Sequence, residues 1–260
     1  MWRRTPEAIF ARHHGNIRPV LRSLVSAVAL VVTCQAQAGT PDILHRPAAP
    51  VAATTPYRAV NDDTVSLLTA LIAIERDLLL GQLFLHDGMV NAEGSHFTHP
   101  RKETIPQIKD ALAARGAPDL EPLLIALEEA KDVKAADAAY LAALAGVKRT
   151  KEALAPTGQD LLRAVILSAE EAHAMLDPSG TTGVTAYQEA WGMLMSARGE
   201  LDALAFSSDP AVKQSAAKMV VAFDGVVLMA PDPAARAAVQ FDPAVVAELI
   251  ATIKGLVDSV

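Results

Sequence analysis

Three histidines lie close together in the sequence, between residues 86 and 99. His96 and His99 are three residues apart, Glu103 follows four residues later, and His86 and Glu93 stand just upstream. Residues three and four apart share one face of a helix, so a turn between two helices could bring these imidazole and carboxylate groups together. Such a set suits Zn, Cu, Ni or Fe rather than Ca or Mg, because imidazole prefers the borderline metals. The segment therefore predicts a transition-metal site formed by His86, Glu93, His96, His99 and Glu103.

The same residues also have a purely structural interpretation. Pro100 disfavours helical backbone geometry at His99, so His96 is expected in the loop and His99 at the helix start, as a cap. Glu103 is favoured near a helix amino terminus by the helix dipole alone. Capping or core hydrogen bonding is thus the alternative to metal binding.

Two E-x-x-H tetrads match the local signature of carboxylate-bridged di-iron bundles, Glu93 to His96 and Glu170 to His173. Glu75 and Glu189 could complete such a ligand set from other helices. The match is poor, because the first tetrad lies in a predicted turn and the second fits the solvated face of a surface helix. No nucleophile elbow, phosphate loop or dinucleotide fingerprint occurs, so we expect no enzymatic activity.

The elements that must position these residues are helices. Apolar residues recur at three- and four-residue steps from about residue 63 to 89, which predicts a long and central first helix. A turn at 91–98 follows, and Pro100 suits the first position of the next helix. Further helices are predicted at about 120–130, 135–154, 159–176, 185–205, 212–229 and 243–257. No segment shows the turn-bounded alternation of a strand.

These helices define the expected fold class. The chain has 260 residues and 51% hydrophobic content but only 4% aromatic residues, a composition that favours closely packed helices with small side chains. We expect an all-α bundle of about seven or eight antiparallel helices over residues 61–260. Gly81, Gly88 and Pro100 are echoed by Gly192, Gly199 and Pro210, which suggests two related halves, 61–155 and 156–260.

The first 38 residues resemble a secretory signal peptide. Five arginines precede the apolar run 24–32, and Ala36-Gln37-Ala38 offers a cleavage site. The apolar run is too short to span a bilayer comfortably, so we expect cleavage after Ala38 and a periplasmic location, with no transmembrane segment in the mature chain. Residues 39–60 are rich in Pro, Ala and Thr and are expected to form an extended leader.

Removal of the signal peptide would change which cysteines and charged side chains the protein contains. Cys34 is the only cysteine, so a chain cleaved after Ala38 has no disulfide and no thiolate ligand. Removing residues 1–38 also leaves 18 basic and 29 acidic side chains. This acidic balance argues against nucleic acid and anionic lipid as partners.

The export signal, the length and the all-α character are similar to those of imelysin-like and iron-uptake helical proteins of the periplasm. Those proteins carry a G-x-H-x-x-E signature. The run from Gly94 to His99 (GSHFTH) matches its glycine and first histidine but has His99 where the glutamate stands. The resemblance is therefore one of architecture, and no family is assigned from it.

Taken together, these patterns predict an exported helical protein that binds a ligand, with a transition metal near residues 86–103 as the specific hypothesis. Two other kinds of protein remain as alternatives. A non-catalytic adaptor for another envelope protein would show a broad exposed apolar patch. A carrier of a small apolar ligand would require a large enclosed apolar pocket.

Overall fold

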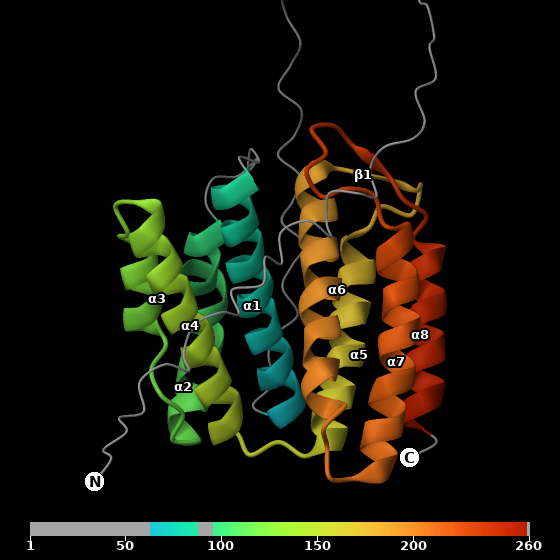
Figure 1. Ribbon diagram of the computed structural model, residues 1–260, viewed down its shortest axis with the longest axis horizontal. Helices are drawn as coiled ribbons and strands as arrows, with labels where there is room; N and C mark the ends of the chain where they lie inside the picture. Colours follow the sequence, from blue (N-terminus) through green and yellow to red (C-terminus); the bar gives the residue numbers. More distant parts are fainter. Residues whose placement is uncertain (1–62, 88–95, 259–260) are drawn as a thin grey trace, which may run out of the picture. The chain divides into compact units, whose positions relative to one another are not determined.

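Eight α-helices make up most of the described part of the chain, which is residues 63–87 and 96–258 of a computed structural model. The prediction of an all-α bundle is confirmed (Figure 1). A 3-10 helix, η1 (His96–Thr98), and a π-helix, η2 (Pro100–Thr104), precede α2. The α-helices are α1 (Thr64–Asp87), α2 (Ile105–Ala114), α3 (Glu121–Glu128), α4 (Val133–Ala153), α5 (Gly158–Met175), α6 (Val184–Leu204), α7 (Pro210–Met229) and α8 (Ala244–Val257).

Several helix starts follow the capping signals in the sequence. Asp63 precedes α1, and its carboxylate accepts a hydrogen bond from the backbone N–H of Ser66 at 2.8 Å. Asp209 and Pro210 open α7 as predicted, with Asp209 Oδ1 accepting from the backbone N–H of Ala211 at 2.9 Å. Short polar side chains at these positions satisfy amide groups that have no partner inside the helix.

Helix α1 occupies the central position that its apolar sequence predicts. It packs against α4 and against α5 and α6, as well as against both short helices. Figure 1 shows it between α4 and α6. Leu67, Leu71, Ile74 and Leu78 have no exposed surface. A helix that is apolar on nearly every side is stable only where every side is covered, so charged residues within it need particular partners.

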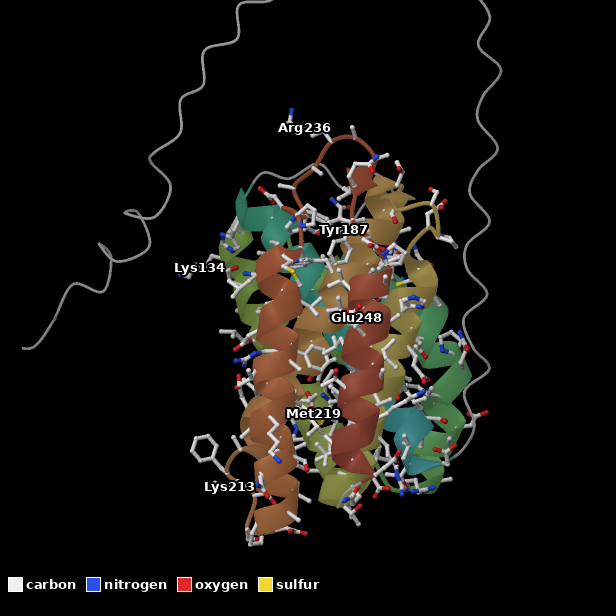
Figure 2. The ribbon with its side chains drawn as sticks, turned by 90° about the vertical axis from the view of Figure 1, so that its right-hand side faces the viewer. Lys134, Tyr187, Lys213, Met219, Arg236 and Glu248 are labelled. Carbon is white, nitrogen blue, oxygen red and sulfur yellow. The ribbon has the colours of Figure 1, made fainter. Side chains whose placement is uncertain are left out.

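Helices α5 to α8 pack together as a four-helix bundle, in which α8 returns to contact α5. A short antiparallel ladder ties two of its loops: β1 (Thr181–Thr182) pairs with β2 (Val239–Gln240). The sequence pattern predicts no strand there. Tyr187 lies at this end of the bundle (Figure 2), where its hydroxyl donates to the carbonyl of Pro231 and its ring contacts Phe241.

The described residues all belong to one compact unit, residues 53–260. The contacts of α1 with α5 and α6 join the two proposed halves, 61–155 and 156–260, into that unit. Their origin by duplication stays a prediction. Within the described part, none of the helices combines the length and apolar character needed to cross a membrane. The predicted signal peptide and the leader, residues 1–38 and 39–60, lie outside the described residues.

Candidate metal centre

Three charged residues, Glu75, Arg76 and Asp77, follow one another in the middle of the apolar helix α1. Consecutive helical residues are turned by about 100° from each other, so the three side chains meet different neighbours. Glu75 reaches Lys151 on α4, whereas Asp77 lies beside η1 and η2. Two separate polar clusters therefore form on the same turn of α1.

The cluster around Asp77 contains two of the predicted histidines. The Nδ1 atoms of His96 and His99 lie 3.6 and 4.0 Å from Asp77 Oδ1. Each of the three side chains offers one ligand atom within 4.8 Å of the other two. Asp77 and His96 have no exposed surface and His99 has only 8%. One carboxylate and two imidazoles thus converge on a point inside the protein.

These groups lack the hydrogen bonds that buried polar atoms normally make. Both ring nitrogens of His96, Nδ1 of His99 and Oδ2 of Asp77 are buried and have no hydrogen-bond partner among the described residues. Leaving one such atom unpaired costs roughly 1–3 kcal/mol, and four unpaired atoms at one point are exceptional. A bound cation would satisfy all of these atoms except the second nitrogen of His96.

Arg76 binds the Oδ1 atom of the Asp77 carboxylate. Its Nε and Nη2 donate hydrogen bonds to Asp77 Oδ1 at 2.9 and 2.8 Å. Gly192 on α6 makes room for the arginine stem, since a Cβ there would lie 3.0 Å from Arg76 Cγ. The guanidinium therefore fixes the orientation of Asp77 and leaves Oδ2 for a ligand.

A close contact with α1 places the two histidines. Asp77, Gly81 and Phe84 are spaced at i, i+4 and i+7, so they share one face of α1. A Cβ on Gly81 would lie only 2.4 Å from the Phe97 ring, so only glycine lets η1 approach this closely. The ring of Phe84 lies 5.1 Å from that of His96, and the His96 and His99 rings are 4.8 Å apart.

The predicted capping role of His99 is not what the structure shows. His99 has helical backbone angles, φ −62° and ψ −45°, although proline follows it, and its side chain makes no capping hydrogen bond. Ile105 N–H instead donates to the carbonyl of Pro100, which closes the wider π-helical turn. Widened turns of this type occur often at functional sites. His99 thus stands at the N-cap position of η2 as expected, but its side chain lies toward Asp77 and does not cap the helix.

Two of the other predicted ligands, His86 and Glu103, are not part of this cluster. His86 is exposed on α1, where its Nε2 lies 2.6 Å from Asp137 Oδ1 on α4. Glu103 is exposed in η2, and the backbone carbonyl of this residue accepts from Gln107. Glu93 lies outside the described residues. The structure therefore brings together His96 and His99 but not His86 and Glu103, because each of the latter two lies on an exposed side of its helix.

Asp77 is the ligand that the search for spaced histidines missed. A signal for it exists in the sequence: it is a carboxylate inside a strongly apolar helix, four residues before the glycine that admits η1. Such a charge must be paired or must bind an ion.

The second polar cluster is fully paired. Lys151 Nζ donates to Glu75 Oε2 and to Glu200 Oε1, both at 2.6 Å, and so joins α4 to α1 and α6. Burial raises the pKa of the Glu75 carboxyl to about 7, although the Lys151 ammonium acts in the opposite direction. Burial and the nearby Glu75 also raise the pKa of the Tyr140 phenol.

The described members of the di-iron ligand set do not come together as a metal-binding group. Glu75 binds Lys151, and Glu170 lies 2.5 Å from Lys254 on α8. Among the described residues, the only group of three or more His, Cys, Asp or Glu side chains suited to a metal is that of Asp77, His96 and His99.

Comparisons of the chain with protein-family models, with curated proteins and with solved structures found no match. The chemistry of the residues therefore carries the functional argument.

Proposed function

We propose that this chain is an exported protein that binds one transition metal ion through Asp77, His96 and His99. The observation that carries the proposal is the convergence of three buried side chains, each of which has at least one polar atom without a hydrogen-bond partner among the described residues. Two imidazoles and one carboxylate suit Zn, Fe, Ni or Cu. Export to the periplasm is part of the proposal and is supported by the signal-like residues 1–38.

The distances fit a site that closes on its ion. Two ligands at about 2.0–2.1 Å from a tetrahedral metal are roughly 3.3 Å apart. Each of the three side chains offers one ligand atom within 4.8 Å of the other two, so the donor atoms need to approach each other by about 1.5 Å or less. Small rotations of the two rings can supply this movement.

The proposal is tested by titrating the purified apoprotein with Zn, Cu, Ni and Fe(II) in a calorimeter, after elemental analysis of the protein as isolated. We expect one ion per chain in the wild type and loss of that binding in a His96→Ala, His99→Ala double variant. Equal binding by the wild type and the double variant would exclude the site.

A matched control separates this site from the one predicted by spacing alone. His86→Ala removes a histidine from the same segment, but this histidine is exposed and bound to Asp137. We expect unchanged stoichiometry and affinity in this variant. Lost binding in His86→Ala would instead place the ion at the exposed end of α1.

The adaptor alternative rests on one observation. Val221 and Leu228 lie seven residues apart on α7 and are 72% and 86% exposed, with Met229 beside them. Residues at this spacing share a helix face, so α7 presents apolar side chains to solvent. A sedimentation experiment on the purified protein tests this surface. Self-association that Leu228→Lys abolishes would support a protein-binding role for α7.

The carrier alternative has less support. The described groove of about 770 Å³ between α5 and α8 is open, and Arg163, Glu170, Lys254 and Asp258 are among its lining residues. A carrier of an apolar molecule needs an enclosed and mainly apolar cavity.

A further inference from the structure

Asp77 can give a metal only one of its two carboxylate oxygens. Arg76 donates two hydrogen bonds to Oδ1, at 2.9 and 2.8 Å, whereas Oδ2 accepts none. A carboxylate that binds through both oxygens would have to give up these bonds to a buried guanidinium. Breaking a buried pair of this kind is strongly unfavourable, so Asp77 should bind an ion through one atom.

Each histidine also supplies one atom, because the two nitrogens of an imidazole point in different directions. The described residues therefore offer three ligand atoms in total. Zinc commonly takes four ligands, and iron and nickel take up to six. Sites with three protein ligands normally complete the shell with water or with an exogenous molecule.

The charges at the site indicate what kind of molecule this is. Arg76 and Asp77 are both buried, and their charges cancel within the pair. Both histidines are neutral when they bind a metal. A divalent ion thus adds positive charge to a buried site that already contains the Arg76 guanidinium. An anionic ligand on the metal lowers the free-energy cost of burying that charge.

We infer that the metal at Asp77, His96 and His99 keeps a coordination position that none of the described side chains fills, and that a small anion occupies it. The inference rests on the proposed metal site and specifies its ligand class. The near-complete burial of the three side chains limits the anion to a few atoms, such as hydroxide, azide or formate.

The test uses cobalt(II), whose visible spectrum reports coordination number and ligand exchange, with sodium azide as the probe in a non-coordinating buffer. We expect a saturable change in the cobalt absorption bands on addition of azide, and no such change in the His96→Ala, His99→Ala variant. Stoichiometric cobalt binding with a spectrum that azide leaves unchanged would overturn the inference while the metal site stands. Failure to bind cobalt would instead refute the metal site itself.

A second variant tests the role of charge. Arg76→Gln keeps a hydrogen-bond donor near Asp77 Oδ1 but removes the positive charge. We expect azide to bind about tenfold more weakly and cobalt to bind more tightly, since the lost charge attracts the anion and repels the cation. A merely structural role would weaken both, and a parallel loss of both affinities would overturn the role assigned to Arg76. Arg76→Lys, which keeps the charge, should restore azide binding.

Discussion

Glu75 and Asp77 lie two residues apart on α1, and both are carboxylates turned toward the interior. Glu75 shares the Lys151 ammonium with Glu200, so its charge is paired by residues of the chain. Asp77 is paired through one oxygen only, and among the described residues His99 Nδ1 and both ring nitrogens of His96 have no hydrogen-bond partner. Burial and charge alone do not distinguish a structural cluster from a binding site. The unpaired donor atoms make that distinction.

The largest effect should come from breaking the paired cluster. Lys151→Met leaves Glu75 and Glu200 buried together without their cation, so we expect the free energy of unfolding to fall by about 3–5 kcal/mol in urea titrations. Metal affinity should not change, because no ligand is touched. Lys254→Met, which removes a half-exposed lysine from its pair with Glu170, is the control and should have little effect on stability. Equal losses in the two variants would contradict the structural role of Lys151.

The pH dependence of the free energy of unfolding should reveal the titration of Glu75. Its pKa is raised in the folded protein from 4.5 to about 7, so the folded state holds this proton more tightly than the unfolded state. The protonated Glu75 therefore stabilises the folded state. This stabilisation is complete below about pH 4.5 and is lost as the pH rises through 7, which lowers the free energy of unfolding by up to about 3 kcal/mol.

Glu75→Gln lacks this proton equilibrium. Its free energy of unfolding relative to the wild type should therefore increase between about pH 4.5 and 7, as measured by urea unfolding across that range. A difference that stays constant with pH would show that Glu75 does not titrate there.

Asp77→Asn should weaken metal binding. The amide keeps an acceptor for Arg76 but loses the charge that binds a cation. We expect metal affinity to fall by roughly 100-fold or more, measured by competition with a chromophoric chelator. Asp137→Asn removes a carboxylate that is also paired with a histidine, but at the surface, and should leave the affinity unchanged. Similar affinities for the two variants would contradict the assignment of Asp77 as a ligand.

The smallest effect concerns how α1 holds η1. Gly81→Ala places a Cβ about where the Phe97 ring lies, at 2.4 Å, so η1 must shift and carry His96 with it. We expect roughly tenfold weaker metal binding by calorimetry. Gly225→Ala meets nothing within 4 Å on α7 and should stabilise the protein by up to about 1 kcal/mol with unchanged affinity. Unchanged affinity in both variants would mean that the approach of η1 does not position the site.

Part of the candidate site could be predicted from the sequence. The spacing of His96 and His99 indicated that they act together, and the structure brings their rings to 4.8 Å from each other. His86 and Glu103 were grouped with them because they are near in sequence, but each lies on an exposed side of its helix. Local spacing gives no information on which way a helix faces once it packs. Asp77 was missed for the same reason, since its partners lie beyond the turn.

The sequence by itself determined the helices and their class of fold, because apolar periodicity, capping residues and prolines act locally. It also determined that α1 is central, since a helix apolar on nearly all sides must be covered. Only the tertiary structure decided which charged residues of α1 are paired and which are not. That choice depends on contacts between segments distant in sequence: Lys151 and Glu200 reach Glu75 from α4 and α6, while Gly81 and Gly192 admit the groups that surround Asp77.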